Sequence, residues 1–164
     1  MAVDAFLKIE GIEGESTDDK FKNQIEILSY SHELTQPTTA SKSSVGGGTS
    51  GRCNHSDFSV VKELDKASPI LAQKCCEGAH IPEVTLTLCR AGGDKLPFMV
   101  YKMTNVVISN LSPGGKSDAE SIPMEKVGFN YGKIEWTYTQ QKRKDGKGGG
   151  NTQGSWNLES NKPS

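Results

Sequence analysis

Apolar and polar residues alternate along most of this 164-residue chain. In its first strand-like segment, Ala5, Leu7 and Ile9 share one face, and Lys8 and Glu10 lie on the other. A period of two is the pattern of a strand with one buried face. Similar segments follow at 24–34, 54–64, 84–89, 96–111, 127–138 and 155–159. Turn residues separate these segments, so the sequence predicts a mainly β protein with antiparallel strands.

One segment carries the signals of a helix instead. Ser68 is a suitable N-cap, Pro69 fits the first helical position and Gly78 fits the C-cap. Between them, Leu71 and Cys75 lie one turn apart and belong to an apolar stripe. A helix this short needs packing against a sheet to be stable. We therefore expect a small antiparallel β-barrel of two packed sheets with one flanking α-helix.

Two segments lack the alternation and predict long loops. Residues 37–51 consist mainly of Ser, Thr and Gly, and residues 142–154 form a flexible stretch rich in Gly and Lys. Loops of this length in a compact domain are either functional or disordered. We expect both of them as extensions of a single domain that spans residues 1–164.

Two strand segments have unusual patterns. The segment 96–111 is apolar on both faces in its first half, with Phe98 on one face and Met99 on the other. Such a strand is predicted to be covered on both sides. In a later segment the apolar residues change parity at Gly132-Lys133, which predicts a β-bulge there.

Composition and charge argue against several classes of function. The net charge of -1 provides no basic face for nucleic acid, and the absence of a run of about 20 apolar residues argues against membrane insertion. Asp4, Lys8 and Glu10 interrupt the N-terminal segment, where a Sec-type leader needs apolar residues. We therefore expect synthesis in the cytoplasm without a cleavable signal peptide.

The four cysteines are expected to be reduced packing residues. Cys75 and Cys76 are adjacent, which is a poor arrangement for a disulfide framework. Cys53 and His55 share one strand face, but no second close pair of ligands lies on a compatible element. We therefore expect no metal site and no role beyond packing for Cys53, Cys75, Cys76 and Cys89.

Candidate catalytic motifs are incomplete. The segment 46–53 has the glycine spacing of a phosphate-binding loop, but Arg52 and Cys53 occupy the positions that need Lys and Ser or Thr. A strand follows it, whereas phosphate binding needs a helix N-terminus. No nucleophile elbow or oxyanion hole is recognisable. The sequence indicates a protein that is not an enzyme and that uses no cofactor.

Five blocks, in this order along the chain, resemble the haemolysin-coregulated protein (Hcp) family, the tube proteins of bacterial type VI secretion. The blocks are Met1–Ile9 followed by Gly14-Glu15-Ser16, Asp65–Pro69, Gly78-Ala79-His80, Leu88–Gly93 and Gly154–Leu158. The chain departs from the family pattern at Tyr30 and His32, where Trp is common, and in a less glycine-rich loop at 37–51.

The resemblance implies a structural subunit. In this family, six copies form a ring, and rings stack into a tube that a contractile sheath propels out of the cell. A trimeric spike protein caps the tube, and secreted effectors ride in its lumen. Export to the medium or to a target cell then needs no leader. Alternatives are a tail-tube protein of a contractile phage and a stand-alone secreted effector or adhesin.

Two sets of residues are candidates for contacts in such an assembly. Ser29 and Ser31 are small hydroxyls that share a parity on an otherwise apolar strand, where the family's ring wall would lie. We expect them to face the lumen and contact cargo. We expect the loop that joins two long strands to stack rings, through Thr38, Thr39, Ser41, Lys42, Val45 and Thr49.

Overall fold

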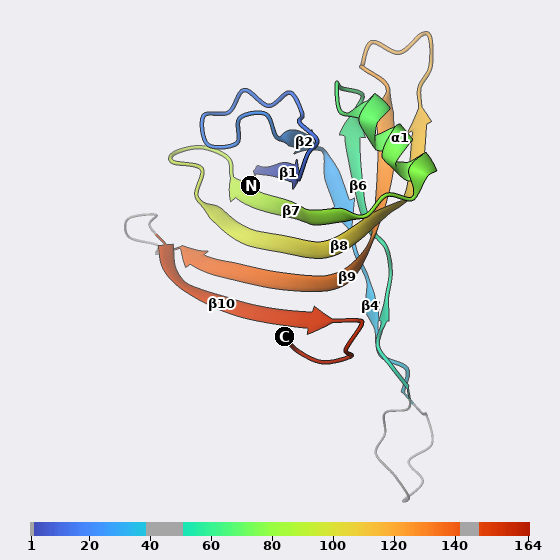
Figure 1. Cartoon of the computed structure of the whole chain (residues 1–164). Coiled ribbons are helices and arrows are strands. Elements are labelled where there is room, and N and C mark those ends of the chain that lie inside the picture. Colours follow the sequence, from blue (N-terminus) through green and yellow to red (C-terminus); the bar gives the residue numbers. More distant parts are fainter. Residues whose placement is uncertain (1, 39–50, 142–147) are drawn as a thin grey trace, which may run out of the picture.

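The structure is a computed structural model that describes residues 2–38, 51–141 and 148–164 (Figure 1). The strands are β1 (Val3–Ile9), β2 (Ile25–Ile27), β3 (Ser29–Ser31), β4 (Leu34–Thr35), β5 (Asn54–His55), β6 (Phe58–Glu63), β7 (Ile81–Arg90), β8 (Pro97–Gly114), β9 (Met124–Gln141) and β10 (Gly148–Asn157). Helix α1 (Ser68–Glu77) connects β6 to β7. The prediction of a mainly β, antiparallel, barrel-like fold with one flanking helix is confirmed for the described residues.

One sheet makes the barrel. Its strand order is β2-β1-β7-β8-β9-β6-β3, with β10 added beside β9. The barrel closes because a single extended segment pairs at both edges: Ile25–Ile27 pair with β1, and Ser29–Ser31 pair with β6. Between these pairings, the Leu28 N–H donates to the Val61 carbonyl over 2.8 Å. Strand β9 is long enough to pair with β6 in its first half and with β10 in its second.

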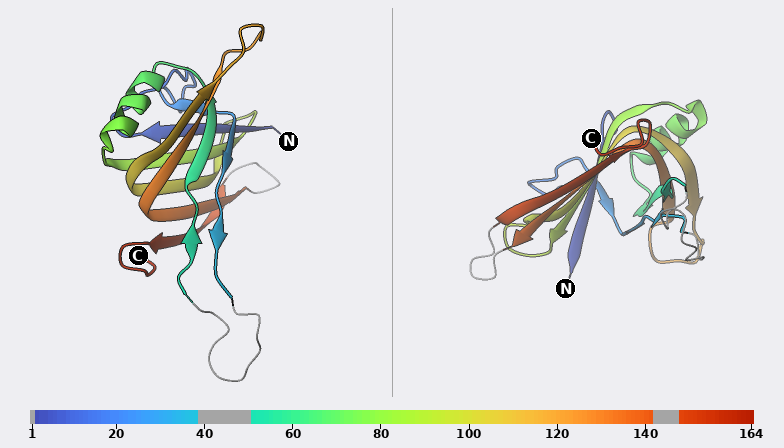
Figure 2. Two further views of the ribbon diagram at one scale, coloured as in Figure 1. Left: turned by 90° about the vertical axis from the view of Figure 1, so that its right-hand side faces the viewer. Right: turned by 90° about the horizontal axis from the view of Figure 1, so that it is seen from below.

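A second, two-stranded sheet projects from the barrel. Strands β4 and β5 pair with each other and extend away from the barrel, as the left view of Figure 2 shows. We call residues 32–38 and 51–56 the arm. Within the arm, Glu33 N–H donates to Ser56 Oγ over 2.8 Å, and Ser56 N–H donates back to the Glu33 carbonyl over 2.9 Å.

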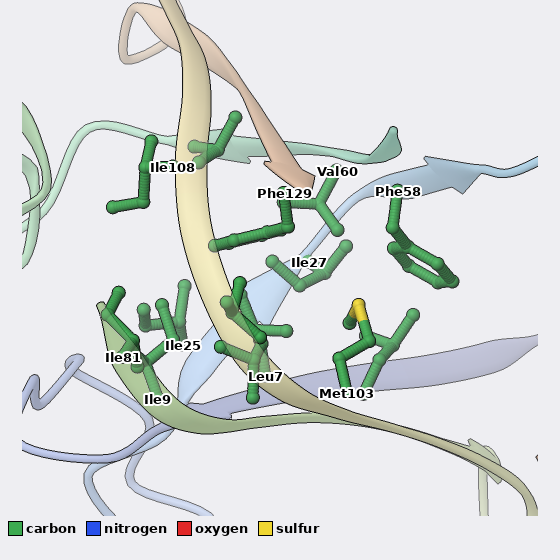
Figure 3. Packing of buried hydrophobic residues seen from close by; sticks show 14 of the residues in the cluster. Leu7, Ile9, Ile25, Ile27, Phe58, Val60, Ile81, Met103, Ile108 and Phe129 are labelled. Atoms are coloured by element: carbon green, nitrogen blue, oxygen red, sulfur yellow. The ribbon is translucent and has the colours of Figure 1, made fainter. Parts of the chain in front are cut away.

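The main core lies inside the bent sheet. Side chains from β1, β2, β6, β7, β8 and β9 point toward one another between the strands (Figure 3). Phe58, Leu71 and Phe129 are among the fully buried members. A smaller cluster of Phe6, Phe21 and Cys89 covers the opposite face of β1 and β7. Burial of this apolar area is the dominant stabilising term of the fold.

On three neighbouring strands, the alternation of inward-facing and outward-facing residues shifts by one position at the same level of the sheet. Two inward-facing residues on each strand are separated by only two others: Ile81 and Val84 on β7, Met103 and Val106 on β8, and Tyr131 and Ile134 on β9. The pairing register is continuous across all three strands at this point. The sheet therefore bends along one line, which we call the crease.

The predicted bulge at Gly132-Lys133 is wrong, although the change of parity is real. A bulge leaves one extra residue on one strand, whereas the crease shifts every strand equally. The register shift between β8 and β9 lies instead between Ile108 and Asn110. At the crease, Asn105 takes a left-handed φ of 54°.

The start of α1 differs from the sequence prediction. Ala67 is the N-cap and makes no side-chain cap bond, so the predicted N-cap Ser68 lies inside the helix. The Ser68 hydroxyl instead donates to Glu125 Oε1 over 2.6 Å and accepts from the Asp65 N–H over 3.0 Å. Gly78 is the C-cap as predicted, with a left-handed φ of 61°.

Three loop and strand predictions need comment. The predicted loop at 142–154 is too long, because β10 begins at Gly148 and pairs with β9. Residues 142–147 and 39–50 lie outside the described residues. The first half of β8 was expected to be covered on both faces, but Pro97–Lys102 are only half-buried. All four cysteines are free thiols in the structure.

Candidate functional site

Strand β3 presents the two serines predicted to face a lumen. Ser29 pairs with Val61 and Ser31 pairs with Ser59, and both serines are exposed. Tyr30 between them lies on the opposite face, where its ring stacks on Phe58 at a centroid distance of 6.0 Å. Pairing to β6 therefore fixes Ser29 and Ser31 on the outer face of β3, where they are free to contact another molecule.

The predicted stacking residues fall largely outside the described part of the chain. Thr38 is exposed, and Thr39, Ser41, Lys42, Val45 and Thr49 lie outside the described residues. The Gln36 side-chain amide donates to the Gly51 carbonyl over 3.0 Å. Together with the β4–β5 pairing, this bond joins the two described strands of the arm to each other.

A single phenol joins the arm to the barrel. Tyr131 on β9 is buried, and its hydroxyl lies 2.7 Å from His32 Nε2 and 2.7 Å from His55 Nδ1. Burial lowers the pKa of both imidazoles, and the neighbouring His55 lowers that of His32 further. Burial raises the pKa of the Tyr131 phenol, so this group stays protonated at neutral pH. We call these three residues the clasp.

A hollow of about 360 Å³ lies between the arm and the sheet. Its lining combines apolar and polar side chains from the arm, β9, β10 and the C-terminal segment: Leu34, Gln36, Gly51, Arg52, Cys53, His55, Trp136, Trp156 and Asn161. The chain has two tryptophans, and both contribute to this lining. An aromatic wall of this kind, rimmed by polar groups, is typical of contact surfaces.

The outer part of the β8–β9 sheet has two different faces. On the face that continues the core, Met99 pairs with Tyr138 and Tyr101 pairs with Trp136. These side chains are half-buried, and Tyr138 is 45% exposed. The other face carries charges, where Lys102 Nζ lies 3.7 Å from Glu83 and 3.9 Å from Glu135.

The sequence did not predict the clasp. His32, His55 and Tyr131 are separated by many residues, and only the closure of β3 and β9 around β6 brings them together. In the described part of the chain, no three His, Cys, Asp or Glu side chains converge on one point. No helix there is long and apolar enough to cross a membrane.

Comparisons with known proteins agree with this geometry. The family model for the type VI secretion system effector Hcp matches residues 6–138. The chain is 35% identical to protein hcp1 of Pseudomonas aeruginosa over 162 residues, which cover 98% of each chain. It is 25% identical to the major exported protein of the same organism, over 84% of this chain and 90% of that protein.

Solved structures give the same result. A type six secretion system protein, 34% identical, superposes with a TM-score of 0.92 over 99% of this chain and 100% of its own. Hcp1 from Salmonella typhimurium, 32% identical, superposes with a TM-score of 0.82 over 100% of both chains. The barrel, the helix and the arm thus lie within a fold shared along the whole length. The chain belongs to the Hcp family of type VI secretion proteins, a family of structural and secreted proteins rather than of enzymes.

Proposed function

We propose that six copies of this chain form a closed ring and that the rings stack into the tube of a type VI secretion machine. In this proposal the contractile sheath propels the tube, a trimeric spike protein caps it and effectors ride in its lumen. The protein is made in the bacterial cytoplasm and leaves the cell folded. The observation that supports the ring is an apolar face of the β8–β9 sheet that stays partly exposed in the single chain.

The apolar face is formed by four large side chains of β8 and β9. Met99, Tyr101, Trp136 and Tyr138 continue the core face of the sheet beyond the closed part of the barrel. Aromatic side chains bury large areas and are enriched in protein interfaces. The charged outer face around Lys102 is a poor alternative for burial, because its ions would lose their solvation.

The edge of the sheet supports the same proposal. Among the described strands, β10 pairs with β9 alone, so its other edge is available along most of its length. An open strand edge is a template for pairing with another chain. A contact in which the edge and apolar face of one copy meet a different surface of the next copy is heterologous, and such contacts form a ring when the rotation between copies closes.

Native mass spectrometry of the full chain at micromolar concentration tests the ring. We expect a complex with six times the 17.7 kDa mass of one chain, and rings in negative-stain images. Tyr138→Asp places a charge on the apolar face and should yield monomers. Thr137→Asp, on the opposite face of the same strand, is the matched control and should keep the ring. A wild-type protein that is only monomeric contradicts the proposal. If both variants form rings, the apolar face is not part of the contact between neighbouring copies.

We place Ser29 and Ser31 on the lumen surface of the ring. Their exposure on β3 and their small hydroxyl groups suit a hydrated channel wall. Ser31→Gln should keep the ring but reduce the amount of effector that co-purifies with it. Ser112→Gln, at another exposed serine, should leave effector retention unchanged. Equal retention by both variants would place β3 on the outside of the ring.

A further inference from the structure

The clasp holds both strands of the arm with one hydroxyl group. His32 lies just before β4, His55 lies in β5, and Tyr131 is fixed in the wall of the barrel on β9. The two hydrogen bonds between Glu33 and Ser56 at the base of the arm join its strands to each other and not to the barrel. Besides the chain connections to β3 and β6, the clasp and the side chains that line the hollow hold the arm against the barrel.

The number of protons in the clasp is limited by hydrogen-bond chemistry. A phenol has one proton to donate, so it donates to one imidazole nitrogen and accepts an N–H from the other. At least one of His32 Nε2 and His55 Nδ1 is therefore unprotonated, and that histidine is neutral. If both histidines were imidazolium ions, both contacting nitrogens would carry protons. The Tyr131 proton would then lose its acceptor, and two cations would face each other.

The surroundings offer little compensation for two cations. The imidazole centroids of His32 and His55 are 6.4 Å apart, and the ring of Phe58 lies 5.1 Å from that of His32. Arg52 and Cys53 line the hollow beside His55. The aromatic rings of Tyr30 and Tyr101 pack against Phe58 on the barrel side.

Asp57, which lies just before β6, already has hydrogen-bond partners. The negative charge of Asp57 helps to raise the pKa of the Tyr131 phenol. Its carboxylate accepts hydrogen bonds from Ser109 Oγ over 2.7 Å and from Asn130 Nδ2 over 3.2 Å. The clasp is therefore stable with at most one protonated histidine.

We propose that the clasp is a proton-operated latch, in which protonation of both His32 and His55 releases the arm from the barrel. The pKa of both imidazoles is lowered from the ordinary 6.5 in the closed arm. The open arm takes up protons more readily than the closed arm, so acid favours opening. The closed arm is fully favoured above about pH 6.5 and loses this advantage as the pH falls below it. The latch belongs to the single chain and does not depend on the ring.

Tryptophan fluorescence of the full chain tests the latch. Both tryptophans line the hollow that the arm covers, so release of the arm changes their solvent exposure. Between pH 8 and pH 5 we expect one step in the emission, with its midpoint below pH 6.5. Tyr131→Phe removes only the hydroxyl group and should show the low-pH emission already at pH 8, with no step. His80→Gln removes the third histidine of the chain, which lies outside the clasp, and should keep the wild-type step.

Three results would overturn the latch: no step in the wild-type protein, an unchanged step in Tyr131→Phe, or loss of the step in His80→Gln. A second measurement needs no variant and so does not depend on its folding. Nitrogen-15 NMR of the imidazole groups at pH 8 should show one contacting nitrogen, His32 Nε2 or His55 Nδ1, without a proton. Protons on both contacting nitrogens at pH 8 would equally exclude the latch.

Discussion

Lys62 is a fully buried cation that lies in the wall of the barrel. Its ammonium group forms ion pairs with Asp65, at 2.9 Å, and with Glu125, which is 2% exposed, and it donates to the Ser68 hydroxyl. Lys62→Met should lower the free energy of unfolding by about 3–5 kcal/mol, because it leaves a buried carboxylate without its cation. Urea denaturation monitored by circular dichroism measures this loss.

Two further variants compare the contribution of the buried Lys62–Glu125 pair to stability with that of an exposed surface charge. Lys62→Met combined with Glu125→Leu removes both charges and should cost less than Lys62→Met alone. Lys102→Met breaks exposed ion pairs and should change the free energy of unfolding by about 1 kcal/mol or less. Equal losses from Lys62→Met and Lys102→Met would show that the buried pair is not special.

Cys89 and Cys76 should differ sharply in reactivity. Burial, together with the charges of Asp4 and Asp18, raises the pKa of the Cys89 thiol to about 11. Only the thiolate reacts, so Cys89 in the folded chain should be alkylated by iodoacetamide at least about 100-fold more slowly than the exposed Cys76 at pH 8. Peptide mass spectrometry measures both rates. Similar rates in the folded protein would contradict the burial of Cys89.

At the scale of elements, local signals predicted some boundaries and tertiary pairing decided others. Gly78 ends α1 as expected, because the left-handed C-cap is a local conformation that glycine adopts without strain. Ser68 did not become the N-cap, because its hydroxyl is used by the buried Lys62–Glu125 pair. Gly148 starts β10 despite a glycine-rich sequence, since pairing with β9 overrides the weak strand propensity.

The crease depends on one residue with an unusual backbone. Asn105 has a φ of 54°, and its side chain lies 2.9 Å from His80 Nδ1 and donates to Glu159 Oε1 over 2.8 Å. Asn105→Ala should destabilise the fold by about 1–3 kcal/mol, because alanine avoids this conformation and both side-chain contacts are lost. Asn105→Gly loses the same contacts but accepts the positive φ, so it should be more stable than Asn105→Ala by about 1 kcal/mol. Thermal unfolding of both variants measures the difference, and equal stabilities would mean that the backbone conformation is unstrained.

At the scale of the whole molecule, the sequence predicted the class of the fold but not its closure. The alternation around Ala5–Glu10 indicates which residues face the core, because that depends only on the period of a strand. The alternation does not show that the segment 25–31 pairs with β1 and β6 at once, or that Tyr131 meets His32 and His55. Those contacts join residues far apart in the chain and follow from the strand order of the closed sheet.

In our proposal, the arm mediates the stacking of rings, and the barrel strands mediate the closure of each ring. Strands β4 and β5 of the arm extend away from the barrel strands that we assign to ring closure (Figure 2). Ordering a chain segment on binding costs about 1–2 kcal/mol per residue, so a contact between two rings should be weak and should depend on protein concentration. Shortening residues 38–49 to a Gly-Ser turn should therefore leave rings intact and abolish tubes.

Electron microscopy and sedimentation velocity distinguish these outcomes. As a matched control, shortening the connection between β8 and β9 at residues 116–121 removes a different exposed segment and should leave both rings and tubes unchanged. Secretion should fall with the shortened arm and persist in the control, because export requires the stacked tube. If the shortened arm instead produces monomers, residues 38–49 belong to the contact between neighbours within a ring, because only the loss of that contact dissolves the ring itself.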